Sequence, residues 1–563
     1  MCGIYGAYGA KNLPLVKALQ LSMLNRGPDK QGIYSDDDIS LGMNRLHLWG
    51  EKTNEIPFEM NSCRLSFNGE IYGGINPDFT YKPNNNGGIG ELKFAEENQR
   101  QSVLDGMYAI AEYNTAEKTL TLSRDRFGIK PLFYTCNNRQ IIFSSCIRSL
   151  TTALPGYRPA LHPDALFDIF AYGYPLTDQT AFTGIKELMP GYELLAKNNS
   201  VTLKPLHFPE LSGYDSGVKS IRTTIRRALE GCIKGAYKIG LAVSGGIDST
   251  ILAHELNAMG VTDIETFSVV LEEAGDGVRE LSDLGFSGKG PWNTWKHHYV
   301  EINPENFTGH ALSSTDHFQY PTDMHSLPLY NILAKCVAER GIRILLTGEG
   351  VDEFFMGYNK YLDYRNTRRA DRYYLLSAKG RFMEDIFDPA VIEGGVQRVN
   401  RFAEGDFWSQ IRSVEIRCRL QKLLHRTDVI LMEHSIEGRT PFLHGGLPEI
   451  ALGSPVEKVR GPYGKTVIRK AYSDIVKGLM NKPKKRFKAS EQLFIDTFNR
   501  PAIKEYLYEP IHIDGVNLNS NVIDKIYRAY ENGTQAEQSD LSELLFLILT
   551  TKKSLKSQFY EAV

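Results

Sequence analysis

The stretch Leu241-Ala-Val-Ser-Gly-Gly-Ile-Asp-Ser-Thr250 decides the architecture of the larger part of this chain. The apolar run at residues 239–243 predicts a short buried strand, and residues 251, 252 and 256 are spaced for one face of a helix. The glycine-rich turn between them lets backbone N–H groups converge on an anion, and the helix N-terminus adds its positive end. Asp248 is placed where a carboxylate could hold Mg²⁺ against a phosphate. We interpret the stretch as a nucleotide site, the alternative being a plain turn; no lysine follows the glycines, so it is not the G-x-x-x-x-G-K-[ST] loop.

Strands and helices alternate on both sides of this turn. Apolar spacing predicts helices around residues 221–233 and 329–339, and strands at 264–271 and 342–346. Such alternation implies a doubly wound parallel sheet, in which ligands bind beyond the carboxyl ends of the strands. The chain is therefore expected to be α/β, with helices added to a parallel sheet in its C-terminal part.

A second motif follows the strand at 342–346, in Leu346-Thr-Gly-Glu-Gly-Val-Asp-Glu353. Asp352 would supply a second carboxylate for Mg²⁺, although an acidic helix start favoured by the helix dipole is the alternative. Glu349 lies in a glycine-flanked loop, where a carboxylate could orient or deprotonate an incoming amine. Lys465 opens a later helical run and could neutralise charge on the α-phosphate and the leaving pyrophosphate, although on its own it would be read as a surface lysine.

The N-terminus carries a candidate nucleophile, in Met1-Cys2-Gly3-Ile4. Removal of Met1 would place the thiol and a free α-amino group of pKa ~8 on the same residue, so that the amine could serve as the base. A buried structural cysteine is the alternative. Further on, residues 67–72 predict a strand that breaks into a turn, and an Asn68 amide beside the Gly69 N–H is what an oxyanion hole requires. Arg45 lies at the end of another expected strand.

Bulk composition limits the classes of function. The 563 residues are 42% hydrophobic and 23% charged, with a net charge of −2, which is ordinary for a globular protein and gives no general attraction to nucleic acid or membrane. The apolar runs are shorter than the ~20 residues of a membrane span. No signal peptide and no paired cysteine spacing are visible, so a cytoplasmic setting is expected. A stretch without periodicity at 197–215 predicts a boundary between domains at 1–200 and 205–563.

Taken together, these motifs resemble asparagine synthetase: a class II glutamine amidotransferase domain followed by an ATP pyrophosphatase-type synthetase domain. The resemblance implies an αββα four-layer N-terminal-nucleophile domain, in which Cys2 forms a thioester with glutamine, Asn68 and Gly69 stabilise the oxyanion, and Arg45 and Glu70 hold the glutamine backbone. In the second domain it implies catalytic roles for Glu349 and Lys465, Mg²⁺ on Asp248 and Asp352, and ATP bound by Ser244, Gly245, Gly246, Asp248, Ser249, Val270 and Gly348.

The implied reaction is adenylation of an acceptor carboxylate, aspartate by resemblance, followed by attack of ammonia that passes from Cys2 through an internal tunnel. Products would be asparagine, glutamate, AMP and pyrophosphate. The expected partners are small molecules, glutamine, ATP and the acceptor acid, and a homodimer is possible. The alternatives are a related adenylating synthetase that uses another carboxylic acid or closes an internal amide as β-lactam synthetases do, and a nucleotide-binding pseudoenzyme.

Several residues depart from the family pattern. In the glutaminase part Glu91 has no Asp two residues before it, Asn25 stands where the family often has His, and Cys146 where it often has Glu. In the synthetase part these are Val351, Met356 and His444, together with an insertion at 275–293. The second group is expected to lie near the acceptor.

Overall fold

The computed structural model describes residues 2–50, 55–99, 101–137, 140–198, 200–206, 217–235, 238–271, 295–358, 361, 377–401, 405–475 and 491–556. The insertion at 275–293 and most of the expected boundary segment therefore lie outside the described residues. No helix in the described part of the chain has the length and apolarity that crossing a membrane requires.

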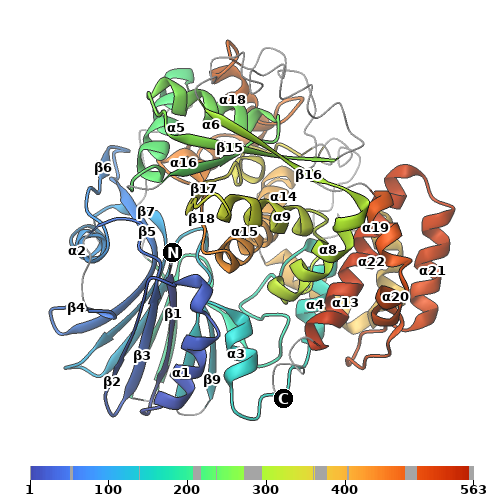
Figure 1. Ribbon diagram of the computed structural model, residues 1–563, viewed down its shortest axis with the longest axis horizontal. Helices are drawn as coiled ribbons and strands as arrows, with labels where there is room; N and C mark the ends of the chain where they lie inside the picture. Colours follow the sequence, from blue (N-terminus) through green and yellow to red (C-terminus); the bar gives the residue numbers. More distant parts are fainter. Residues whose placement is uncertain are drawn as a thin grey trace.

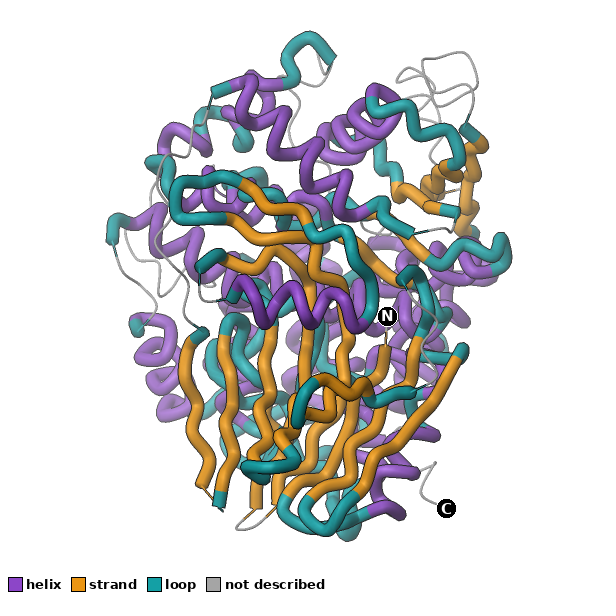
Figure 2. The backbone as a smooth tube through the Cα atoms, turned by 90° about the vertical axis from the view of Figure 1, so that its left-hand side faces the viewer, coloured by secondary structure: helices purple, strands orange, loops and turns teal. Residues whose placement is uncertain are grey.

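Two antiparallel sheets form the N-terminal part (Figure 1). The first sheet has the order β11 (Lys186–Glu187), β9 (Phe133–Asn137), β10 (Gln140–Ser144), β1 (Cys2–Tyr8), β3 (Ile39–Arg45) and β2 (Lys30–Ser35). The second has the order β13 (Ser200–Pro205), β12 (Tyr192–Lys197), β8 (Thr119–Arg124), β7 (Val103–Asn114), β5 (Cys63–Ile75) and β4 (Phe58–Met60), with β6 (Tyr81–Pro83) paired to β5. Their long strands run side by side in the lower half of Figure 2.

Helices cover the outer faces of these sheets and complete the four layers expected from the sequence. Helices α1 (Leu13–Leu21) and α3 (Ile147–Ala153) belong to the first sheet, and α2 (Ile89–Asn98) packs on β5 of the second. Apolar side chains that alternate along the strands fill the space between the sheets, among them Ile4 and Leu41 from one and Ala109 and Ala111 from the other.

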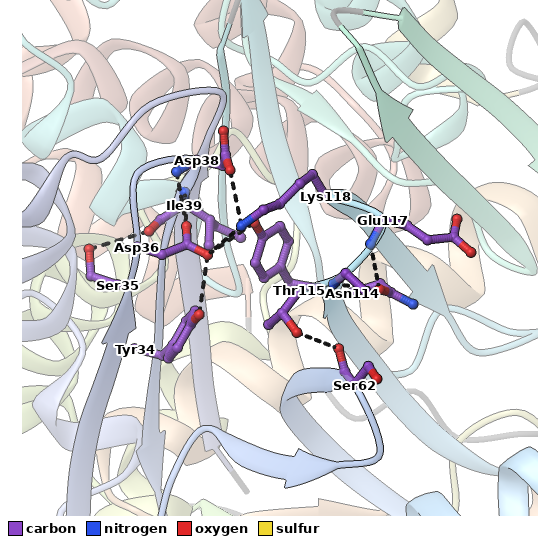
Figure 3. Close-up of polar contacts among 12 residues, drawn as sticks. Tyr34, Ser35, Asp36, Asp38, Ile39, Ser62, Asn114, Thr115, Glu117 and Lys118 are labelled. Atoms are coloured by element: carbon purple, nitrogen blue, oxygen red, sulfur yellow. Dashed lines mark hydrogen bonds and ion pairs between the residues drawn. The ribbon is translucent and has the colours of Figure 1, made fainter.

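A polar cluster joins the two sheets at the end remote from Cys2 (Figure 3). The carboxylate of Asp36, at the turn between β2 and β3, accepts hydrogen bonds of 3.1 Å from the hydroxyls of Tyr34 and Tyr113. Lys118 pairs with the same carboxylate at 3.4 Å and with Asp38 at 3.3 Å. Because Tyr113 belongs to the other sheet, these contacts fix the sheets against each other.

The C-terminal part contains a five-stranded parallel sheet of the doubly wound type. Its order is β16 (Lys296–Ile302), β15 (Ile264–Leu271), β14 (Ile239–Ala242), β17 (Ile344–Leu346) and β18 (Glu437–Arg439). Ile344 and Leu346 pack with α5 (Val218–Cys232) and α6 (Ile247–Ala258), whereas Leu345 packs with α9 (Leu327–Ala338). Helices therefore cover both faces, which confirms the expected architecture.

Further helices extend this part of the chain, drawn mostly in yellow to red in Figure 1. They are α8 (Pro304–Phe318), α10 (Val351–Phe354), η4 (Ala378–Phe382), α12 (Met383–Ile386), α13 (Pro389–Asn400), α14 (Phe407–Val414), η5 (Glu415–Leu420), α15 (Gln421–Glu433), η6 (Pro441–Leu443), α16 (Leu447–Leu452), α17 (Val456–Arg460), α18 (Thr466–Ala471), α19 (Glu491–Phe498), α20 (Pro501–Tyr508), α21 (Ser520–Glu531) and α22 (Gln535–Lys556). The N-terminal part adds η1 (Leu24–Arg26) and α4 (Pro163–Tyr172).

Two local expectations differ from the structure. Residues 67–72 do not break into a turn but lie inside the continuous strand β5, whose register with β7 shifts only between Ile71 and Gly73. The stretch expected to be a linker from residue 197 begins inside a hairpin, because β12 pairs with β13 up to Pro205. The division into domains at 200 and 205 stays a prediction.

Candidate active site

The glycine-rich turn lies at the point where the order of the parallel strands reverses. β14 has β15 on one side and β17 on the other, so the loops that leave β14 and β17 border a crevice at their carboxyl ends. Gly245 has φ +71°, a conformation that favours glycine, and the Ser249 hydroxyl accepts a 3.2 Å hydrogen bond from the Ser244 N–H. The loop is thus folded back onto the first turn of α6.

Three charged side chains predicted from distant parts of the sequence meet beside this loop. The Nζ atom of Lys465 lies 2.7 Å from Asp248 Oδ2 and 2.7 Å from Asp352 Oδ1, and all three side chains are almost completely buried. Gly357 leaves room for this contact, because a Cβ there would come within 2.2 Å of both Asp352 Oδ1 and Lys465 Cε. The two carboxylates therefore form a place that receives a cation.

Glu349 is held by a buried network on the other side of the loop after β17. Its carboxylate accepts hydrogen bonds from Tyr330 at 2.5 Å, Thr347 at 2.7 Å and Thr427 at 2.8 Å. The guanidinium of Arg426 pairs with the same carboxylate and lies over the Tyr330 ring, 3.7 Å from its centroid. Glu349 is thus fixed in position before any substrate binds.

A cavity of about 790 Å³ connects these groups. Of the predicted ATP, metal and amine-site residues, those on its wall are Ser244, Asp248, Ser249, Gly348, Glu349 and Asp352. Lys465 contacts the cavity through the two aspartates. Gly245, Gly246 and Val270 are not among its lining residues in the described part of the chain, and Val269 lines it instead of Val270.

The predicted glutaminase residues meet at the start of β1. The backbone nitrogen of Cys2, which becomes the α-amino group once Met1 is removed, donates a 3.0 Å hydrogen bond to Asn68 Oδ1. The other end of this amide, Asn68 Nδ2, is buried and has no hydrogen-bond acceptor among the described residues. Gly69 has φ +142°, and a Cβ on it would lie 1.9 Å from the Met107 carbonyl oxygen, so no other residue fits.

Burial dominates the electrostatics of Cys2. It raises the pKa of the thiol above its ordinary value, although nearby positive charge, that of Arg45 included, opposes the shift. Such a thiol needs a base to become a nucleophile, and the nitrogen held by Asn68 lies on the same residue.

The two residues predicted to hold glutamine lie beside Cys2, in different surroundings. Arg45 is opposite Cys2 in the pairing of β1 with β3, and its guanidinium packs on the Phe58 ring. Glu70 follows Gly69 in β5, accepts a 2.5 Å hydrogen bond from Trp49 and pairs at 3.3 Å with Arg439 of the parallel sheet. Burial and the neighbouring Glu437 raise the pKa of Glu70.

Glu91, the residue without its family partner, is buried at the start of α2. Its carboxylate accepts hydrogen bonds from the backbone N–H of Ile71 at 2.8 Å and of Gly88 at 2.9 Å. Burial, together with the charge of Glu70, raises its pKa well above the ordinary value. Glu91 therefore ties α2 to β5.

Three of the departures expected near the acceptor do not line the cavity in its described portion, and the insertion at 275–293 lies outside the described residues, so their relation to the acceptor stays a prediction. His444 Nδ1 donates a 2.9 Å hydrogen bond to the carboxylate of Asp105 in β7 and so joins the two parts of the chain. Met356 is buried with φ +52°, a conformation that glycine adopts at lower cost. Neither residue, and not Val351 either, lines the cavity in its described portion. Asn25 donates a 3.1 Å hydrogen bond to Glu433, and Cys146 stands at the N-terminal end of α3 near Arg26.

The sequence did not predict most of the cavity wall on the side remote from the glycine-rich turn at 244–246. Asp323, Lys379 and Lys422 lie there, with residues of α22 and of the C-terminal end of α4. These side chains come from segments without a recognisable motif. Their shared surface arises from tertiary packing.

Comparison with known proteins agrees with this geometry. The chain matches the family model described as Asparagine synthase over residues 220–555, and the one described as Glutamine amidotransferase domain over residues 1–76 and 94–207. The unmatched residues 77–93 include the segment around Glu91.

Relatives resemble the chain over most of its length at low identity. Asparagine synthetase [glutamine-hydrolyzing] 1 of Bacillus subtilis (strain 168) is 25% identical over 544 residues, which cover 84% of this chain and 85% of that protein. A probable asparagine synthetase of Acanthamoeba polyphaga mimivirus is 26% identical over 567 residues, 90% and 93% of the two chains. Amidase chyE of Penicillium rubens is 25% identical over 378 residues, 60% and 54%. Because the first family model spans more than half of the sequence, the chain belongs to the asparagine synthase family, as an ATP-dependent ligase joined to a glutamine amidotransferase domain.

Proposed function

We propose that this enzyme activates the side-chain carboxylate of aspartate as an acyl-adenylate and amidates it with ammonia released from glutamine at Cys2. The products are asparagine, glutamate, AMP and pyrophosphate. The observation that carries the proposal is the contact of Lys465 with both Asp248 and Asp352 beside the glycine-rich loop, at the wall of a cavity of about 790 Å³.

Adenylation joins a carboxylate oxygen of the acceptor to the α-phosphorus of ATP, and the bond from that phosphorus to pyrophosphate breaks. Ser244 and Ser249 line the cavity, which supports binding of the leaving pyrophosphate by this loop, with Lys465 neutralising its charge. The aspartates already hold one cation, the Lys465 ammonium, which supports Asp248 and Asp352 as the residues that would hold Mg²⁺. Bound there, Mg²⁺ would supply charge neutralisation to the triphosphate. The described residues include no cluster of three or more His, Cys, Asp or Glu side chains that could hold a metal alone.

Amide formation requires a proton to leave the attacking nitrogen. Glu349 is a carboxylate on the cavity wall, held in place by Arg426, and we assign it as the acceptor of that proton. The three neutral hydroxyl donors around it keep it oriented while AMP departs from the acyl carbon.

Glutamine hydrolysis is assigned to the N-terminal part. The Cys2 thiolate attacks the amide carbon, the Cys2 amine takes the thiol proton, and ammonia leaves as the thioester forms; water then releases glutamate. Asn68 Nδ2, buried without an acceptor, and the Gly69 N–H support an oxyanion hole at this place. Ammonia is then carried through the interior to the acyl-adenylate, across the interface where Glu70 meets Arg439.

A second candidate keeps this chemistry but changes the acceptor to another carboxylic acid. The extent of the cavity favours it, because the wall includes Gln535, Ser539 and Glu543, a stripe of α22 about 12 Å long. Closure of an internal amide without glutamine is disfavoured, because the oxyanion donors beside Cys2 would then serve no reaction.

The test measures product formation and pyrophosphate release with glutamine or with ammonium chloride as nitrogen donor. Cys2→Ala should abolish the glutamine-dependent reaction and leave the ammonia-dependent reaction intact. Equal loss with both donors would rule out two separate sites. If another carboxylic acid supports pyrophosphate release and aspartate does not, the second candidate replaces the first. If no acid yields AMP, the result supports a pseudoenzyme.

A further inference from the structure

A buried lysine on the cavity wall has no part in the reaction described above. Lys422 lies in the first turn of α15, is 8% exposed and lines the cavity. Its Nζ atom donates a 2.6 Å hydrogen bond to Asp323 Oδ1, its one acceptor among the described residues. An ammonium group has three N–H donors, so hydrogen-bonding capacity remains at the cavity surface.

The acidic partner of Lys422 is shared with a second lysine. Lys379 pairs with Asp323 Oδ2 at 2.7 Å, and it also pairs with Glu543 of α22 at 2.9 Å. Lys379 thus pairs with two carboxylates, whereas Lys422 pairs, in the described part of the chain, only with Asp323, which it shares with Lys379. Burial lowers the pKa of Lys422, Asp323 opposes this, and the positive charges of Arg419 and Lys379 add to it. A further anion at this place would give Lys422 a second hydrogen-bond acceptor and a counter-charge that it does not share with Lys379.

The N-terminal part of the chain makes room for Lys422. Gly173 ends α4 with φ +96°, and a Cβ on it would lie 2.9 Å from Lys422 Nζ and 3.2 Å from its Cε. Glycine is therefore required both by the backbone conformation and by the path of the lysine side chain. Both residues line the cavity, so its far wall is built jointly by the two parts of the chain.

Lys422 lies at a fixed distance along α15 from the residue that holds Glu349. It lies one helical turn, about 6 Å along α15, before Arg426, which holds Glu349. The facing loop contributes Asp323 to Lys422 and Ser326 to Arg426, at 2.6 and 2.5 Å. Glu349, held by Arg426, and Lys422 therefore lie one helical turn apart on the same cavity wall.

We propose that Lys422 determines acceptor specificity by binding a second carboxylate of the acceptor, so that the enzyme selects dicarboxylic acids over monocarboxylic ones. A carboxylate fits because it both accepts hydrogen bonds and supplies the compensating charge, whereas an amide or hydroxyl supplies no charge. The inference rests on the proposed adenylation at this cavity, but it does not depend on which dicarboxylic acid is used.

The experiment compares acids that keep one carboxylate and differ in the other. L-aspartate, L-glutamate and succinate carry two carboxylates; isoasparagine and β-alanine are matched to aspartate but carry one. Pyrophosphate release is followed with ammonium chloride as nitrogen donor, which keeps the glutaminase out of the assay. Variants are Lys422→Met, Lys422→Arg and, as the control, Lys552→Met. Lys552 is a buried lysine of α22 bonded to two backbone carbonyls and absent from the described cavity lining.

Wild-type enzyme and Lys552→Met should both favour the dicarboxylic acids. Lys422→Met should raise KM for them by roughly 10- to 150-fold, the range for loss of one charged hydrogen bond, with kcat and the KM for ATP nearly unchanged. It should also abolish the preference for aspartate over isoasparagine, and Lys422→Arg should restore part of it. A preference that survives in Lys422→Met overturns the proposal.

If no acid is turned over, the proposed function is refuted, and a binding measurement then tests the role of Lys422 separately. Thermal unfolding is recorded with each acid in the presence of a non-hydrolysable ATP analogue. Dicarboxylic acids should raise the unfolding temperature of the wild type and of Lys552→Met, but not that of Lys422→Met. If the one-carboxylate acids stabilise the wild type equally, or if no acid stabilises it, Lys422 does not read a second carboxylate.

Discussion

Replacing Lys465 by methionine tests the cation site directly. The substitution keeps the length of the side chain and removes the charge that both Asp248 and Asp352 contact at 2.7 Å. Removing one partner from a buried ion pair costs about 3–5 kcal/mol of folding free energy, because the remaining charge stays buried. Here two carboxylates, each 4% exposed, are left facing each other, so the loss should lie within or above that range unless one of them takes up a proton.

The same reasoning predicts that a divalent cation rescues the variant. With Lys465 absent, Mg²⁺ can bind between the two aspartates without displacing an ammonium group. At a concentration 100 times its Kd it would return about 2.7 kcal/mol, which is more than half of the lower estimate of the loss. In the wild type without nucleotide the lysine competes for the same place, so Mg²⁺ should stabilise it less.

Denaturant unfolding in EDTA and in MgCl₂ measures both effects, with Lys470→Met as control. Lys470 is an exposed lysine in α18, and its replacement should change stability by less than about 0.5 kcal/mol. ATP-dependent pyrophosphate release should fall about 100- to 1,000-fold in the Lys465 variant even when Mg²⁺ restores its fold. The reasoning is refuted if Lys465→Met is as stable as wild type in EDTA, or if Mg²⁺ stabilises the two proteins equally.

Other substitutions test the remaining parts of the site. Asn68→Ala should lower glutamine-dependent turnover about 100- to 1,000-fold while ammonia-dependent turnover, measured in the same preparation, stays within two-fold; a parallel fall of both would disprove the oxyanion role. Although burial opposes the shift, neighbouring positive charge, that of Arg439 included, lowers the pKa of Glu437 to about 2. Its contribution to stability is therefore present above pH 4.5 and lost as pH falls toward 2, and Glu437→Gln should flatten the acid side of the stability profile, measured by unfolding at each pH. Asp428→Asn breaks a buried ion pair with the N-terminal part and should cost about 3–5 kcal/mol, whereas Asp29→Asn breaks a partly exposed pair across the same interface and should cost at most about 1 kcal/mol in denaturant unfolding; similar costs would contradict the burial argument.

The parts of the fold that follow from local patterns were predictable. An apolar strand, a glycine-rich turn and a helix follow one another at 239–258, and the same strand-to-turn pattern precedes Asp352. Since parallel strands present their carboxyl ends at one edge, the sequence alone places Asp248 and Asp352 together despite the 104 positions that separate them. The contact of both aspartates with Lys465 confirms that geometric inference, while their roles toward ATP and Mg²⁺ stay predictions.

One error arose where tertiary structure overrides a local signal, and part of the cavity wall was not predictable, while the role of Val270 toward ATP stays a prediction. Asn68-Gly69 is a common turn dipeptide, yet it lies in mid-strand because β7 pairs with β5 along its whole length. Val269 and Val270 are equally apolar, and a shift of one residue exchanges the two faces of a strand, so the sequence could not say which of them borders the cavity. On the far wall, Lys422 and Asp323 form a hydrogen bond although they are 99 positions apart, and no periodic pattern in the sequence predicts this pairing.

Three consecutive residues of α15 explain how one structure can serve two reaction centres. Arg426 and Thr427 contact Glu349 at the cavity, and Asp428 pairs at 2.8 Å with Arg26 behind the strand that carries Cys2. Successive residues of a helix point about 100° apart, so a single turn reaches both sides of the interface. Because each of these contacts is buried, a displacement of α15 that released one of them would disturb the other. The same helical turn therefore fixes the position of Arg26, next to the strand that carries Cys2, and the position of the Glu349 carboxylate.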